Sequence, residues 1–223
     1  MSTSTASSSS GISRRTLVIG GLAVAAAAGA GWYFLGQDLL GGKDSVMTAG
    51  TLPDLHQGSE DAPVTFIEYS SLTCPHCAAF HKDVLPTLKS KYIDTGKVKY
   101  IVREFPLDKL AFAGFAVARC AGPDRYYPLV ELMYDRQNVW AFGEGEPRDR
   151  LFSIAKQAGF TEKTFEDCLN NTEIVKGIGD ARQRAAEKFG VNSTPTFFIN
   201  GQMVKGIRDS AELDRVLEPF LKG

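Results

Sequence analysis

The sequence has no surplus of positive charge and few cysteines. Its 223 residues include 25 Lys and Arg against 26 Asp and Glu, so the formal net charge is −1. A chain without a basic field does not attract phosphate backbones, and we expect no nucleic-acid partner. Four cysteines are too few for disulfide bonds to be the main stabilisation of a domain of this length. The composition, with 43% hydrophobic and 23% charged residues, is that of a globular protein and excludes disordered, collagenous and polytopic membrane proteins.

Residues 1–37 predict an export signal or a membrane anchor. Arg14 and Arg15 precede a stretch, 16–37, that is rich in Ala and Gly and has no charged residue. This arrangement resembles a bacterial twin-arginine signal. Residues 17–35 are also about long enough to span a membrane, so cleavage and anchoring both remain open. In either case the two arginines hold the N-terminus inside, and the rest of the chain lies outside the cytoplasm.

The chain after this segment predicts strands and helices in a mixed order. Residues 38–62 are rich in Gly, Asp, Ser and Pro and predict a linker. Residues 107–170 show only short amphipathic helices. The other expected elements are a strand at 64–69, a helix from Pro75 kinked at Pro86, a strand at 98–105, a helix at 173–189 ended by Gly190, a hairpin of 196–199 and 202–205 around Asn200–Gly201, and a last helix opened by Asp209 and Glu212.

This order predicts a mixed sheet with helices on both faces. The arrangement fits an α/β thioredoxin-like fold with an inserted all-helical domain. Residues 63–106 and 171–223 would form the thioredoxin-like domain, and residues 107–170 would form the helical insert.

Cys74-Pro75-His76-Cys77 is a C-x-x-C motif at the point where a strand ends and a helix begins. The free N–H groups and positive dipole end of the helix lie beside the Cys74 sulfur and stabilise its thiolate. In such motifs the thiol pKa falls from about 8.5 to between roughly 3.5 and 7. A stable thiolate favours the reduced form, which makes the disulfide an oxidant. His76 can donate a further hydrogen bond or charge, and Cys77 would be the shielded partner.

Two further features point to the same site. Thr194-Pro195 precedes a strand, where a cis-proline loop facing the disulfide would leave the Thr194 backbone free to pair with an extended substrate. Glu68 lies on the otherwise apolar strand that leads to Cys74. It is either a surface residue at a sheet edge or a buried acid with a raised pKa that exchanges a proton with Cys77.

These motifs together resemble the DsbA family of bacterial periplasmic thiol-disulfide oxidoreductases, over residues 60–223. The quoted segments are Phe66-Ile67-Glu68-Tyr69, Cys74-Pro75-His76-Cys77 and Thr194-Pro195-Thr196-Phe197-Phe198-Ile199-Asn200-Gly201. The resemblance implies a dithiol oxidase that gives its disulfide to exported proteins with free cysteines. A DsbB-like, quinone-linked membrane protein would reoxidise it. No cofactor and no metal are implied, and we expect a periplasmic monomer.

The resemblance also implies roles for single residues. Cys74 would be the attacked sulfur, Cys77 its partner and His76 the thiolate stabiliser. Glu68 would be the buried acid, with Lys99 as the family's buried lysine beside it. Pro195 would be the cis-proline. Cys120 and Cys168, both in the insert, look like the second, structural disulfide of the alphaproteobacterial branch, which would contribute about 4 kcal/mol in the chain-entropy model; two free buried thiols are the alternative.

Two positions depart from the family pattern. Thr194 precedes the proline where the best-known members have Val, and this choice is seen in isomerases. His81 replaces an acid one helical turn after Cys77. A disulfide isomerase or reductase of the same fold is therefore the alternative function. A non-catalytic zinc or thiol-binding module is a further one, because Cys74-x2-Cys77-x3-His81 has zinc-like spacing and Cys120 or Cys168 could supply a fourth ligand.

Overall fold

A computed structural model describes residues 45–222 of the chain. The predicted export signal or anchor, with its span at 17–35, lies outside the described residues. Within them, no helix is both long and apolar enough to cross a membrane. Residues from Val46 onward form one compact unit.

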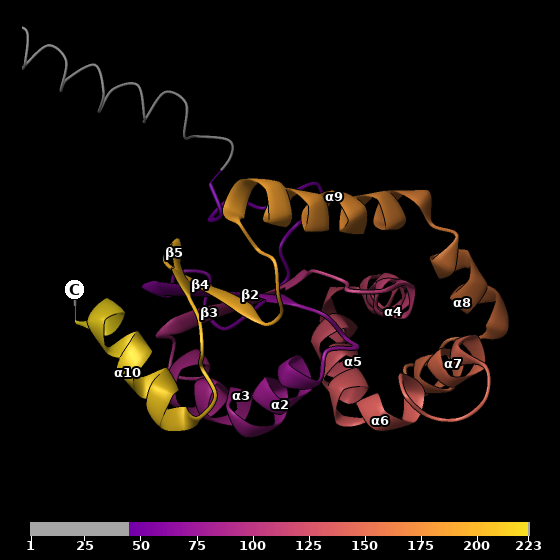
Figure 1. Cartoon of the computed structure of the whole chain (residues 1–223), viewed down its shortest axis with the longest axis horizontal. Helices are drawn as coiled ribbons and strands as arrows, with labels where there is room; N and C mark the ends of the chain where they lie inside the picture. The colour runs from indigo at the N-terminus through magenta and orange to yellow at the C-terminus, as the bar shows by residue number, and fades with distance from the viewer. Residues whose placement is uncertain (1–44, 223) are drawn as a thin grey trace, which may run out of the picture. The chain divides into compact units, whose positions relative to one another are not determined.

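The sheet has five strands in the order β1-β3-β2-β4-β5 (Figure 1). β2 (Val64–Ser70) and β3 (Val98–Glu104) are parallel and pair along their whole length. β4 (Thr196–Ile199) runs antiparallel to β2, and β5 (Gln202–Val204) runs antiparallel to β4. The mixed sheet with its helices is the predicted thioredoxin-like fold with a helical insert, which the structure confirms.

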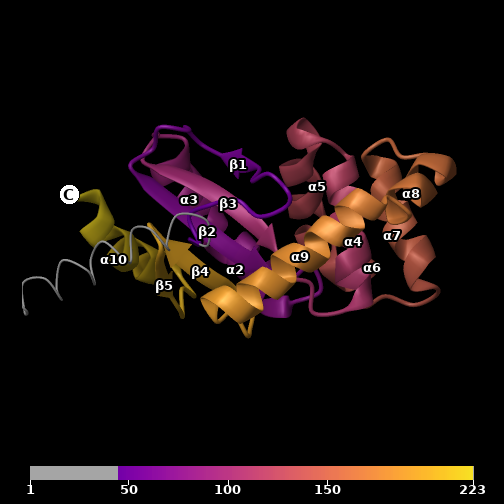
Figure 2. The ribbon, with the colours of Figure 1, turned by 90° about the horizontal axis from the view of Figure 1, so that it is seen from above.

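Helices cover both faces of this sheet (Figures 1 and 2). α9 (Thr172–Phe189) lies across one face, and its Ala185 packs with alternate side chains of β2 and β3. α2 (Pro75–Asp83), α3 (Leu85–Leu88) and α10 (Ser210–Leu221) lie on the other face. Because side chains alternate along a strand, Phe66 and Glu68 face α2, whereas Ile67 and Tyr69 face α9.

The helices expected between 107 and 170 lie at one end of the sheet (Figure 2). Their bounds are α4 (Lys109–Cys120), α5 (Pro123–Asp135), α6 (Gln137–Trp140), α7 (Pro147–Gln157) and α8 (Glu162–Leu169). The buried side chains of these helices are continuous with those on the α2 face of the sheet. One hydrophobic core therefore joins the two parts.

Local signals set several boundaries where the sequence predicted them. The helix that begins at Pro75 breaks at Val84, two residues before Pro86, and resumes as α3 and the π-helix η1 (Lys89–Ile93). Gly190 ends α9 with a left-handed φ of 67°. Asn200 and Gly201 have φ values of 46° and 86°, as a type I′ hairpin turn requires.

The segment predicted as a linker, 38–62, is packed on the sheet over the part that the structure describes. β1 (His56–Gln57) pairs antiparallel with β3, and Val46 is buried against the α9 face. The buried Arg103 on β3 binds Asp54 through both side-chain oxygens, with Nη2 2.7 Å from Oδ2. Composition alone missed these contacts, because they form with residues about 50 positions later in the chain.

Candidate active site

Cys74 is the N-cap residue of α2, with φ −82° and ψ 119°. Its Sγ lies 3.4 Å from the backbone oxygen of Thr194, and only 5% of the residue is exposed. The hydrogen bond from the Cys77 thiol is the largest of the effects that lower the Cys74 pKa to about 5. Thr194 and the backbone N–H groups of Cys77 and His76 add to this effect against the opposing effect of burial. Cys74 is therefore a thiolate at neutral pH.

Cys77 lies one helical turn further on and is fully buried. Burial raises its pKa well above the usual range, and the hydrogen bond to Cys74 and the negative charge of Glu68 act in the same direction. Both cysteines are free thiols in the structure. The pair is thus chemically divided: Cys74 carries the charge, and Cys77 carries the proton.

The loop before β4 completes the face around Cys74. The Thr194–Pro195 peptide bond is cis. Antiparallel pairing of β4 with β2 places this loop beside the end of β2, where the chain turns toward Cys74. The Thr194 side chain lowers the Cys74 pKa, and its buried hydroxyl has no hydrogen-bond partner among the described residues. His76, Pro195 and Phe197 line a groove of about 210 Å³ here.

His76 acts on Cys74 through its backbone. Its backbone N–H is aimed at the sulfur, while the residue itself is exposed beside the groove. The predicted residues Cys74, Cys77, His76, Thr194 and Pro195 are thus brought together at one site.

Glu68 is completely buried on the face of the sheet that carries α2. Its Oε1 accepts a hydrogen bond from the Ser70 hydroxyl at 2.6 Å, and its Oε2 accepts one from the Tyr100 hydroxyl. His81 Nε2 lies 3.1 Å from the same Oε2. Of the two alternatives for Glu68, the structure therefore has the buried acid.

Lys99 is not beside Glu68, and this part of the resemblance is wrong. Its ammonium pairs instead with Glu60 at 3.2 Å. Lys99 precedes Tyr100 on β3, and successive side chains on a strand point to opposite faces. Tyr100 therefore faces Glu68, and Lys99 faces away.

Sequence reasoning missed two residues that hold the active-site loop. Gln137 on α6 donates through Nε2 to the backbone oxygens of Leu72 and Cys74, at 2.8 and 3.0 Å. Asp108, the N-cap of α4, accepts a hydrogen bond from the Thr73 hydroxyl at 2.6 Å. No spacing in the sequence links these residues to the motif, although Asp before a helix is a recognisable cap.

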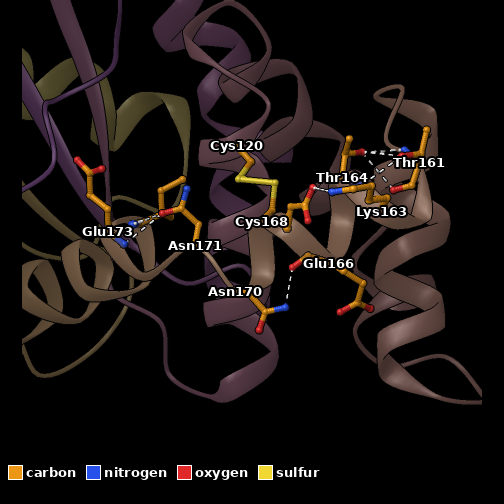
Figure 3. The surroundings of a disulfide bond; sticks show 11 residues. Cys120, Thr161, Lys163, Thr164, Glu166, Cys168, Asn170, Asn171 and Glu173 are labelled. Carbon is orange, nitrogen blue, oxygen red and sulfur yellow. Dashed lines mark hydrogen bonds and ion pairs between the residues drawn. A yellow bond between two sulfur atoms is a disulfide. The ribbon is translucent and has the colours of Figure 1, made fainter.

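Cys120 and Cys168 form a disulfide that joins the last turn of α4 to α8 (Figure 3). Their Cα atoms are 5.9 Å apart. Asp108 lies at the opposite end of α4, about 18 Å away at 1.5 Å per residue. The disulfide is therefore remote from the C-x-x-C motif but attached to a helix that touches its loop.

Residues 51–219 match the thioredoxin family. A Rickettsia typhi protein provisionally named a protein-disulfide oxidoreductase is 32% identical over 173 residues, which are 76% of this chain and 64% of that protein. Disulfide bond formation protein D of Bacillus subtilis is 26% identical over 196 residues, 84% of both chains.

The crystal structure of Wolbachia pipientis alpha-DsbA1 is similar to this chain with a TM-score of 0.70 and 30% identity. The match covers 77% of this chain and 92% of that one. The rickettsial relatives are longer proteins, and the matched region spans between 53% and 65% of their lengths.

Proposed function

Because the chain belongs to the thioredoxin family, and within it to the DsbA-like protein-disulfide oxidoreductases, we propose that it is a dithiol oxidase that introduces disulfides into exported proteins. The observation that carries the proposal is the difference in pKa between the two cysteines, lowered at Cys74 and raised at Cys77. A pKa of about 5 at Cys74 stabilises the reduced protein, so its disulfide is a strong oxidant.

The reaction proceeds through a mixed disulfide. A substrate thiolate attacks Cys74 Sγ of the Cys74–Cys77 disulfide, the new bond joins substrate to Cys74, and Cys77 leaves as a thiolate that takes up a proton. A second substrate thiolate then attacks the substrate sulfur, and Cys74 leaves as a stable thiolate. Two electrons pass from the substrate dithiol to the protein. The Thr194 backbone and Pro195 would hold the extended substrate beside Cys74.

The remaining assignments complete the proposal. The site would act in the periplasm, delivered by residues 1–37 as an export signal or anchor, and a DsbB-like membrane protein would reoxidise it. Residues 107–170 would serve as the helical insert, with Cys120–Cys168 as a structural disulfide. Glu68 would exchange the proton of Cys77.

The reduction potential of Cys74–Cys77, measured by equilibration with glutathione, tests this function. The expected value is about −120 mV. A Cys120→Ser/Cys168→Ser variant checks that the second cysteine pair does not contribute to the measured potential. A value near about −270 mV would instead identify a reductase.

Because of Thr194, a disulfide isomerase is the second candidate function. Its hydroxyl adds to the stabilisation of the Cys74 thiolate, which a protein that must release mixed disulfides also needs. Reactivation of a substrate with scrambled disulfides, compared with oxidation of the same substrate when reduced, separates the two activities. Stoichiometric zinc in the protein purified without chelator would favour the metal-binding module over both.

A further inference from the structure

Cys77 has to gain a proton when the protein is reduced and lose it when the protein is reoxidised, if the proposed function holds. The residue is fully buried, and in the mixed disulfide the substrate covers the Cys74 side of the motif. A proton therefore needs a path through the protein. The described residues provide one on the opposite side of α2 from the substrate groove.

The path begins with Ser70 and Glu68. The Ser70 side chain acts on the Cys77 thiol and lowers its pKa. Ser70 Oγ donates to Glu68 Oε1 at 2.6 Å and contacts the Tyr134 hydroxyl at 2.5 Å. All of these side chains are buried, so none of them exchanges a proton directly with solvent.

His81 continues the path. Its Nε2 lies 3.1 Å from Glu68 Oε2, and its ring packs against the Tyr134 ring with centroids 4.0 Å apart. The side chain is only 3% exposed, yet its second nitrogen, Nδ1, has no partner among the described residues. A buried polar atom without a partner is uncommon and asks for an explanation.

A cavity lies next to His81. It has a volume of about 690 Å³ and is lined by His81, Leu85 and Asn138, among other residues of the α2–α3 and α5–α6 segments. Lys82, Asp83, Lys89, Glu131 and Asp135 also line it, so its wall is polar. A polar space of this size holds water. The substrate groove is lined by a different set of residues, with Ala79 common to both.

We propose that His81 is the proton-exit residue of the active site, which connects Glu68 to water in this cavity. The geometry supports a relay from Cys77 through Ser70, Glu68 and His81. His81 contacts neither the substrate nor a cysteine sulfur. Because it acts on the reaction only through Glu68, it is a positioning residue.

Protons balance over one cycle. When substrate reduces the protein, His81 passes its Nε2 proton to the Glu68 carboxylate, which hands it on through Ser70 to the Cys77 thiolate and is again a carboxylate. His81 takes one proton from cavity water at Nδ1. Reoxidation breaks the Cys77 S–H bond and runs the same steps backward, with the proton leaving at Nδ1. Each reoxidation restores the imidazole tautomer that the preceding reduction changed.

Two variants of the whole protein test this inference. His81→Gln keeps a side chain that hydrogen-bonds to Glu68 but cannot pass a proton, and His81→Ala opens room for imidazole from the cavity. His56→Gln is the matched control, since His56 lies on β1 and pairs with the exposed Glu60. The measurement is the single-turnover rate at which a dithiol peptide reduces the oxidised protein, in H₂O and D₂O, with and without added imidazole.

Both His81 variants are expected to react on the order of 100-fold more slowly than the wild type. We also expect a larger solvent isotope effect in both, and imidazole should restore the rate of His81→Ala. The control should behave like the wild type. Wild-type rates in His81→Gln, or slow rates with an unchanged isotope effect and no recovery in imidazole, would overturn the relay. A wild-type protein that does not oxidise the peptide would instead refute the proposed function.

Discussion

Two cysteines of the same motif acquire opposite properties because of where α2 begins. Cys74 precedes the first turn of the helix, where its sulfur meets the Cys77 thiol, the largest cause of its low pKa, and the free backbone N–H groups of His76 and Cys77. Cys77 lies inside the helix, in a core that contains Glu68. One turn of helix therefore separates a stable thiolate from a stable thiol.

The reduced protein should show a thiolate that titrates near pH 5. The folded pKa of Cys74 lies below its unfolded value of 9.0, so the thiolate stabilises the reduced fold fully above pH 9 and loses this effect as the pH falls through 5. Alkylation of Cys74 against pH measures the pKa. In urea unfolding, the free energy of unfolding of the reduced protein should fall toward that of the oxidised protein as the pH is lowered from 9 to 5.

Cys77→Ala is the informative variant for this titration, because the Cys77 thiol is the largest cause of the low pKa. Its Cys74 pKa should be higher than that of the wild type. An unchanged midpoint would mean that Thr194 and the helix N-terminus set the pKa without Cys77.

At the scale of elements, the insert holds the active-site loop through single side chains. Gln137 on α6 reaches two backbone oxygens of the loop that contains Cys74. The Cys74 oxygen also accepts a bond from the Ala78 N–H, but Gln137 Nε2 is the donor found for the Leu72 oxygen.

Gln137→Leu is expected to lower the free energy of unfolding by about 1–3 kcal/mol, because it leaves the Leu72 oxygen unpaired in the core. Urea denaturation measures the change, with Asn138→Ala, an exposed neighbour on the same helix, as the control. Equal stability of the two variants would show that the loop holds its position without the insert.

The disulfide between α4 and α8 closes a loop over a separation of 48 residues. Its removal in Cys120→Ser/Cys168→Ser should destabilise the protein by about 4 kcal/mol in the chain-entropy model. For a chain of this size that corresponds to a Tm lower by roughly 10 °C in calorimetry. We expect the Cys74 titration to stay unchanged, since the disulfide lies at the far end of α4. A Tm equal to that of the wild type would contradict the structural role.

At the scale of the whole molecule, residues 46–62, which precede the first long strand, are part of the folded unit. Arg103 lies on the α9 face of the sheet and is 5% exposed at its side chain, with Asp54 as its ionic partner. Its guanidinium also donates to the backbone oxygens of Val46 and Thr48. This buried charge fastens residues 46–54 to β3.

Asp54→Asn should destabilise the protein by about 3–5 kcal/mol, because it leaves the Arg103 charge buried without its partner. Asp61→Asn, an exposed position of the same segment, should have little effect. Urea unfolding compares the two, and equal midpoints would show that residues 46–54 contribute nothing to the fold.

Much of the fold could be predicted from the sequence because its signals are local. The strand that ends before Cys74, the break near Pro86, the Asn200–Gly201 turn and the end of α9 at Gly190 each depend on a few neighbouring residues. The segment at 38–62 was harder, because its partners on β3 are distant in the chain.

For the site, the sequence by itself determined where the two motifs stand: a C-x-x-C at a helix start and a Thr-Pro before a strand are local patterns that predict thiol-disulfide chemistry. Only the tertiary structure decided which side chains surround that chemistry. Strand alternation and register put Tyr100, and not Lys99, beside Glu68, and the packing of α2 against the sheet brought His81 to the same carboxylate. Such pairings depend on which faces of two elements meet, and no single segment of the sequence contains that information.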